Sequence, residues 1–157
     1  MNTTNAIGLD LNKSNELAEK LNDLLANLQV FYTNTRGYHW NIKGPKFFEL
    51  HAKFEELYDD LILKIDEVAE RILTLGATPL HSYEDYLRIS EVKDSKVVSD
   101  GNQAVNQILI AFKTLIAKER VILDLSDELN DEGTNALMSD YIREQEKLVW
   151  MYSAYLG

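Results

Sequence analysis

The chain has 157 residues, 45% of them hydrophobic, with 26 acidic and 16 basic residues and a formal net charge of −10. This length fits a single domain spanning residues 1–157 with a sizeable core. The acidic balance argues against a broad nucleic-acid or anionic-membrane surface, and the absence of cysteine excludes disulfides, thiolate metal sites and cysteine nucleophiles.

The N-terminal segment is polar and lacks the basic and then apolar pattern of a signal peptide. We expect residues 1–14 to form a flexible tail, and no apolar stretch of the sequence reaches the length of a membrane span. A cytoplasmic location is therefore expected, with association with the nucleoid left open.

Helical periodicity predicts a first helix over about residues 15–40, where large apolar residues recur every three or four positions. Gly44 and Pro45 then interrupt the pattern. A second helix is predicted from Phe47 to Leu75, with Gly76 as its C-cap.

A crossover over about residues 81–96 is expected to contain one short helix, and a third long helix follows over about residues 100–129. The turn-like segment 130–133 separates it from a fourth helix over about residues 134–155. Four long helices with a long middle connection predict an all-α, ferritin-like four-helix bundle with one crossover.

Metal-binding residue types recur four positions apart on the predicted second helix, as His51 with Glu55 and Asp66 with Glu70. Residues at this spacing stand one above the other and can hold the same ion. The 11 residues from Glu55 to Asp66 make about three turns, so both pairs share a face, but they rise about 16 Å. Because a metal–ligand bond is only about 2.0–2.2 Å long, one chain cannot close all four side chains around a single ion.

A second copy of the chain solves this problem. If the second helix packs antiparallel against its twin about a two-fold axis, His51 and Glu55 of one copy meet Asp66 and Glu70 of the other, twice per dimer. His39, at the end of the first helix, would join each site. Imidazole and carboxylate donors with open positions suit redox-active iron, whereas the Glu-x-x-His pairs of a di-iron site inside one bundle are absent from the sequence.

Simpler interpretations apply to some of these residues. A lone histidine on a helix, such as His51 taken by itself, is more often a surface or capping residue than a ligand. His81 follows Pro79 in the crossover, and we interpret it as a surface residue. Glu67 is interpreted as the partner of Arg71 in an i, i+4 ion pair on a solvated face.

Several segments together resemble the signature of Dps miniferritins, a family of the ferritin-like superfamily. These segments are Tyr38-His39-Trp40-Asn41, Gly44-Pro45, Phe47-Phe48-Glu49-Leu50-His51 and Asp66-Glu67-Val68-Ala69-Glu70-Arg71. The similarity is dense over residues 31–79, and the helix layout agrees over the whole chain. It implies a hollow dodecamer of two-fold dimers that oxidises Fe²⁺ at inter-subunit ferroxidase centres and stores ferric mineral, protecting against oxidative damage.

The resemblance also implies roles for individual residues. The positions that match the family's ligands are His39, His51, Asp66 and Glu70. At Glu55 many members have aspartate, which is shorter by one methylene, and Trp40 matches a tryptophan held beside the iron site. Most members use hydrogen peroxide as the oxidant, with oxygen as the alternative.

Two further sets of acidic residues acquire roles from the resemblance. Glu55 and Glu56 are candidates for nucleating the mineral. Acidic residues near the start of the fourth helix line three-fold pores in the family, which makes Asp127 and Asp131 candidates for admitting Fe²⁺ by electrostatic focusing.

DNA binding in the family relies most clearly on a lysine-rich N-terminal tail. Here the first fourteen residues contain one basic residue, Lys13, and one acidic residue, Asp10. We therefore predict weak or absent direct DNA binding. The competing hypothesis is a nucleoid-compacting or cage-forming structural protein with little iron oxidation, which Fe²⁺ and peroxide would distinguish from a ferroxidase.

Overall fold

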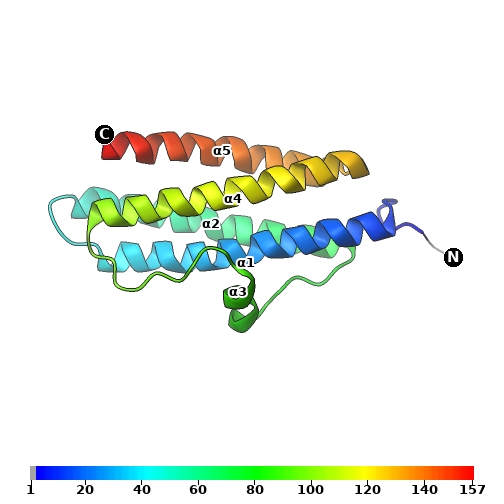
Figure 1. Cartoon of the computed structure of the whole chain (residues 1–157), viewed down its shortest axis with the longest axis horizontal. Coiled ribbons are helices and arrows are strands. Elements are labelled where there is room, and N and C mark those ends of the chain that lie inside the picture. Colours follow the sequence, from blue (N-terminus) through cyan, green and yellow to red (C-terminus); the bar gives the residue numbers. More distant parts are fainter. Residues whose placement is uncertain (1–2) are drawn as a thin grey trace.

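The computed structural model describes residues 3–157 and contains five helices within them. In chain order they are α1 (Leu11–Asn41), α2 (Phe47–Leu75), α3 (Tyr83–Ile89), α4 (Gly101–Leu129) and α5 (Glu132–Leu156). The four long helices run side by side along one axis, and the short α3 lies in the crossover outside them (Figure 1). The predicted all-α bundle with one crossover is confirmed.

Local side-chain chemistry sets several helix ends. Asp10 and Asp100 accept hydrogen bonds from backbone N–H groups in the first turns of α1 and α4, as N-caps do. At the end of α2, Gly76 adopts a left-handed conformation with φ of 96°, which glycine reaches without steric cost. The predicted C-cap of α2 is confirmed.

The first helix begins at Leu11, four residues earlier than predicted. Ser14 is fully buried, and its hydroxyl accepts a hydrogen bond from the Asn5 side chain at 3.1 Å. Asn5 also donates to the backbone carbonyl of Leu75 at the end of α2, at 3.3 Å. Assigning residues 11–14 to a tail was therefore wrong: Asp10 caps the first turn of α1, and Asn5 joins that turn to the end of α2. Residues 1–2 of the predicted tail lie outside the described residues.

The apolar faces of the long helices meet in one core. Phe31 of α1 and Phe112 of α4 pack edge to face with ring centroids 5.1 Å apart, and Phe54 of α2 is fully buried beside them in the same cluster. Packing is close between α1 and α2, between α1 and α4, and between α4 and α5, whereas α2 and α5 lie further apart. Among the described helices, none combines the length and apolar content that crossing a membrane requires.

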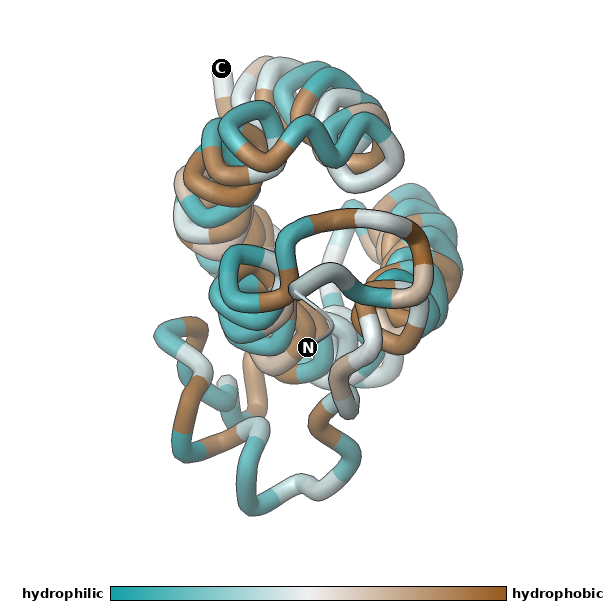
Figure 2. Tube along the Cα trace, turned by 90° about the vertical axis from the view of Figure 1, so that its right-hand side faces the viewer, coloured by the Kyte–Doolittle hydropathy of each residue, from teal (hydrophilic) through white to brown (hydrophobic). Residues whose placement is uncertain are grey.

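The crossover runs along the outside of the bundle, as the end-on view in Figure 2 shows. No residue of α3 is buried. Instead, the buried Asn27 of α1 accepts hydrogen bonds from the Ser90 hydroxyl at 3.2 Å and from the backbone N–H groups of Glu91 and Val92 at 3.0 Å. Side-chain hydrogen bonds from α1 therefore fix the path of the crossover.

Candidate metal centre

The two histidines of the predicted site hold each other in place. His39 lies in the last turn of α1 and His51 near the start of α2, and their rings stack with centroids 3.8 Å apart. Nδ1 of His39 lies 2.6 Å from the His51 carbonyl oxygen, and Nδ1 of His51 lies 2.7 Å from the His39 carbonyl oxygen. Because a carbonyl oxygen only accepts, both Nδ1 atoms donate, which leaves Nε2 of each ring as the atom that can bind a metal.

Aromatic side chains that the sequence analysis did not identify surround this pair. Phe47 stacks on the His51 ring at 4.9 Å, and Tyr58 meets the His39 ring edge-on at 5.4 Å. Tyr32 of α1 packs against Tyr58 at 6.0 Å. Phe47 precedes His51 by one turn and Tyr58 follows it by two, so helical spacing could have indicated both. These rings restrict the orientation of the imidazoles.

The carboxylates of the second predicted pair also lie together. Asp66 and Glu70 are exposed on α2. Hydrogen bonding with Asp66, and then the negative charge of Asp66, raise the pKa of Glu70. Two carboxylates held this close repel each other, and a cation bound between them would relieve that repulsion. Their chemistry therefore fits a divalent cation.

One face of α2 carries all four of these ligand candidates on that helix together with apolar side chains. At 100° per residue, ten partly or fully exposed residues fall within one arc of about 100°, which we call the ligand face. They are Phe48, His51, Ala52, Glu55, Asp59, Ile62, Asp66, Ala69, Glu70 and Leu73. Exposed apolar residues thus stand at both ends and near the middle of a polar stripe.

A single chain does not bring these ligands together. Between His51 and Glu70 the helix rises about 28 Å at 1.5 Å per residue. Within residues 3–157, no three histidine, aspartate or glutamate side chains lie close enough to hold one metal ion. The ligand set divides into His39, His51 and Glu55 at one end of the face and Asp66 and Glu70 at the other.

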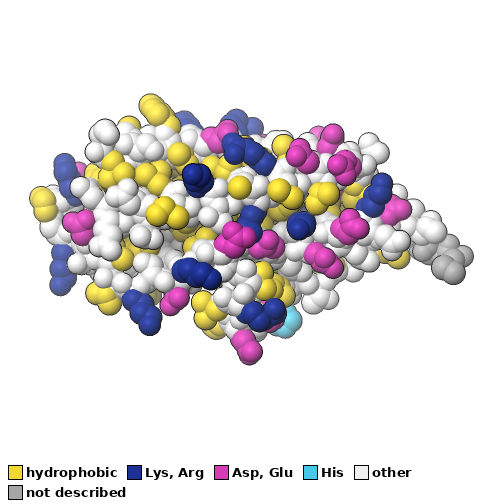
Figure 3. All heavy atoms as spheres, viewed as in Figure 1, with side chains coloured by type: hydrophobic (Ala, Val, Ile, Leu, Met, Phe, Trp, Pro, Cys, Tyr) yellow, Lys and Arg dark blue, Asp and Glu magenta, His cyan; other side chains and the backbone are white. Residues whose placement is uncertain are grey.

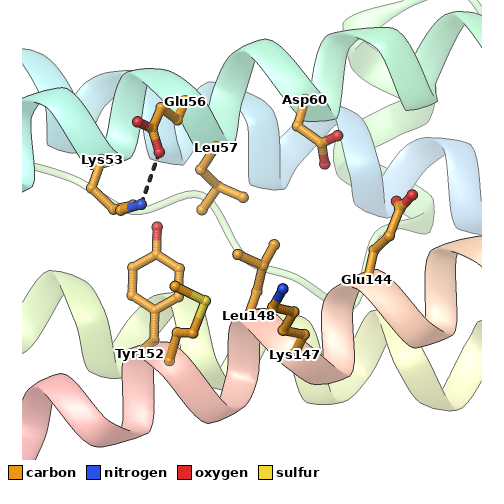
Figure 4. A pocket seen from close by; sticks show the side chains of 9 residues that line it. Lys53, Glu56, Leu57, Asp60, Glu144, Lys147, Leu148 and Tyr152 are labelled. Carbon is orange, nitrogen blue, oxygen red and sulfur yellow. Dashed lines mark hydrogen bonds and ion pairs between the residues drawn. The ribbon is translucent and has the colours of Figure 1, made fainter.

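A groove with a volume of about 350 Å³ separates α2 from α5 (Figure 4). By their helical positions, the α2 residues that line it lie on the side turned away from the ligand face. Glu56 lines this groove and forms an ion pair with Lys53 at 2.8 Å. Asp60 and Glu144 extend the acidic lining. The two nucleation candidates therefore occupy different surfaces, Glu55 on the ligand face and Glu56 in the groove.

The structure gives Asp131 a different role from the predicted pore lining. Its carboxylate is buried, caps α5 through the Thr134 N–H at 3.1 Å, and contacts the Arg71 guanidinium at 2.6 Å. A buried and paired carboxylate does not present itself to passing cations, so this assignment is not supported. Asp127 is exposed at the end of α4 and stays a candidate.

The predicted ion pair between Glu67 and Arg71 is also wrong. Arg71 turns toward α5, and Glu67 instead accepts a hydrogen bond from the Tyr141 hydroxyl at 3.1 Å. Helical spacing allowed the i, i+4 pair, but the buried carboxylate that caps α5 is the stronger partner for the guanidinium.

Trp40 and His81 both lie at the surface of the chain. Trp40 is 63% exposed, and the Arg36 guanidinium lies 4.8 Å from its ring centroid. His81 is exposed, with Nδ1 3.1 Å from the carbonyl oxygen of its neighbour Pro79. His81 is therefore separate from the histidine pair.

Comparison with known proteins gives consistent results. The family model described as ferritin-like domain matches residues 18–157. A crystal structure of a Dps protein from Vibrio cholerae O1, described as a member of a broad superfamily of ferritin-like diiron-carboxylate proteins, is 58% identical with a TM-score of 0.98, covering 100% of this chain and 99% of that chain.

Two further relatives are more distant. The DNA protection during starvation protein of Porphyromonas gingivalis is 45% identical over 86% of this chain and 85% of its own length. A crystal structure of a Dps protein from Bacillus brevis is 34% identical with a TM-score of 0.90, covering 93% of this chain and 98% of that chain.

Proposed function

Because the chain belongs to the Dps family of ferritin-like proteins, we propose that it oxidises Fe²⁺ at sites shared between two subunits. The ferric product is stored as mineral inside a closed homo-oligomer, a dodecamer of two-fold dimers. Removing Fe²⁺ and peroxide together would protect the cell against oxidative damage.

The arrangement of the ligand face carries this proposal. Three pairs of its residues are centred on the same point of α2, between Asp60 and Leu61. They are Phe48 with Leu73, His51 with Glu70, and Glu55 with Asp66. An antiparallel two-fold contact centred there places each residue opposite its pair on the other copy.

Such a contact would both complete the metal site and bury apolar surface. Each histidine pair would meet the carboxylates of the partner subunit's Asp66 and Glu70. The partner subunit's Leu73 would lie opposite Phe48, which is 83% exposed in the isolated chain. Burying apolar surface at about 25 cal/mol per Å² would stabilise the dimer.

The donor set suits Fe²⁺ as a substrate. Imidazole nitrogen and carboxylate oxygen bind iron in its oxidisable state, and the mutual hydrogen bonds of His39 and His51 keep Nε2 of both rings available. Few ligands per ion leave positions for the oxidant. Two Fe²⁺ ions each lose one electron, hydrogen peroxide takes both electrons and two protons, its O–O bond breaks, and two water molecules form.

The test is iron oxidation by the assembled protein. Adding Fe²⁺ without oxygen and then peroxide should give a rapid rise in ferric absorbance. Replacing both histidines, His39→Ala with His51→Ala, should slow the initial rate by about 10–100-fold while the particle mass is unchanged. His81→Ala is the matched control and should leave the rate unchanged.

The alternative function, a nucleoid-compacting or cage-forming structural protein, predicts a different outcome. In that case the unmodified protein would assemble but would not increase the rate of ferric formation over buffer. That result would overturn the proposed oxidation.

A further inference from the structure

The seam between α2 and α5 is held by polar side chains. These helices lie further apart than the other neighbouring pairs, and the groove of Figure 4 runs between them. Lys64 of α2 contacts the Glu144 carboxylate of α5 at 2.7 Å. Nearer the end of α2, Arg71 reaches across to the first turn of α5.

Arg71 is docked on α5 through two nitrogen atoms. Its Nε donates to the Thr134 hydroxyl at 2.8 Å, and its Nη2 donates to Asp131 Oδ1 at 2.6 Å. The Asp131 side chain is 2% exposed and that of Arg71 19% exposed. Solvent therefore screens this pair little, and two directed bonds fix the guanidinium in one orientation.

Gly133 completes the fit. A Cβ atom added at this position would lie 2.6 Å from Arg71 Nη1, closer than real Cβ contacts come. A side chain at residue 133 would therefore require the Arg71 guanidinium to shift from this position. The Asp131 carboxylate, the Thr134 hydroxyl and the open space at Gly133 together accommodate the Arg71 guanidinium.

The carboxylates next to Arg71 lack such support. Within residues 3–157, no hydrogen bond or ion pair with another helix holds the side chains of Asp66 and Glu70, which influence each other on α2. Their position is therefore set by the placement of the α2 backbone. Metal sites tolerate deviations of only about 0.2 Å in ligand distance, so a shift of this helix end would weaken the site.

We propose that Arg71 is a positioning residue for the shared metal site, which rests on the proposed function. By docking the end of α2 on α5, it fixes where Asp66 and Glu70 stand relative to the partner subunit's His51. It also links the carboxylate half of the site to the α4–α5 turn, which follows the end of α4 that carries Asp127.

The experiment measures metal binding by the assembled, metal-free protein. Co²⁺ is the probe, because its visible absorption reports ligand geometry without any oxidation. Arg71→Gln should weaken Co²⁺ binding by about tenfold and alter the spectrum. Arg71→Lys keeps the positive charge but loses the two directed hydrogen bonds of the guanidinium, and it should have a smaller effect. Gly133→Ala should reproduce the Arg71→Gln result by displacing the guanidinium.

Arg143→Gln is the matched control, because Arg143 is exposed on α5 and pairs with Asp140 of the same helix at 3.0 Å; it should leave Co²⁺ binding unchanged. A lower melting temperature with unchanged Co²⁺ affinity and spectrum in Arg71→Gln would show a merely structural role and overturn the inference. If Arg71→Gln fails to assemble, the same readout on Arg71→Lys and Gly133→Ala decides.

Failure of the proposed function is distinguishable from failure of this inference. Loss of Co²⁺ binding in the variant with His39→Ala and His51→Ala establishes the site independently of iron oxidation. A protein that binds Co²⁺ there but does not oxidise Fe²⁺ loses the proposed function, while the Arg71 variants still test positioning. If the unmodified protein binds no Co²⁺ at those ligands, both proposals fail.

Discussion

The Nδ1 atom of His51 lies 2.7 Å from the carbonyl oxygen of His39, and the reverse contact measures 2.6 Å. The two candidate ligands thus join the end of α1 to the start of α2 before any metal binds. This histidine pair should therefore contribute to the free energy of unfolding of the metal-free protein.

Replacing either histidine with alanine should lower the free energy of unfolding of the metal-free protein by about 1–3 kcal/mol, because a carbonyl group loses its partner. The double replacement should cost less than the sum of the single ones, since each removes the same stacked pair. Chemical unfolding of the three variants at one protomer concentration measures this coupling. Strict additivity would contradict it.

Ile62 lies near the centre of the ligand face and is 46% exposed in the isolated chain. Ile62→Lys would bury a charged ammonium group at the proposed two-fold contact, which costs desolvation free energy, and should shift the protein toward smaller species with a loss of iron oxidation of at least about tenfold. Sedimentation and oxidation assays on the same sample check both effects. Ile62→Val is the control and should retain both; a fully assembled, fully active Ile62→Lys protein would argue against the shared site.

Glu119 of α4 is fully buried, and neither of its carboxylate oxygens has a hydrogen-bond partner among the described residues. Burial raises the pKa of Glu119 from 4.5 to about 8, and Gln145, Lys64 and Arg120 lower it only in part. The folded protein therefore holds a proton here that the unfolded chain has released above about pH 4.5.

Stability should consequently fall as the pH rises from 4.5 toward 8, at up to about 1.4 kcal/mol per pH unit from this group. Glu119→Gln should flatten that dependence, which unfolding midpoints at pH 5.5 and 8 would measure. Glu146→Gln is the control, since Glu146 is exposed and paired with Arg120 at 2.8 Å. Equal slopes in the unmodified and Glu119→Gln proteins would contradict the assignment.

Direct DNA binding should be weak. The net charge is −10 per chain, and on the face drawn in Figure 3 basic side chains are scattered among acidic ones. Phosphate binding depends on clustered basic charge and falls with salt. A gel shift at low salt without magnesium should leave DNA unbound at micromolar protein, and tight retention there would refute this prediction.

Sequence periodicity was sufficient for the long helices. The repeat of apolar residues from Phe47 to Leu75, closed by Gly76, located both ends of α2, because burial of one helix face and a left-handed C-cap are local properties. The spacing of His51, Glu55, Asp66 and Glu70 likewise placed these residues on one face, since a regular helix fixes their angles and rise.

The tertiary structure decided which side chains meet. Helical spacing offered Arg71 a partner at Glu67, yet the arginine pairs with Asp131, the N-cap of α5. Asn27 likewise fixes a crossover that lies more than sixty residues away in the sequence. The mutual hydrogen bonds of His39 and His51 are likewise contacts that the tertiary structure decided. The apolar pattern of the sequence indicates which positions of a helix are buried. The hydrogen-bond or ion-pair partner of a polar side chain depends instead on distances between segments, which only the packed chain establishes.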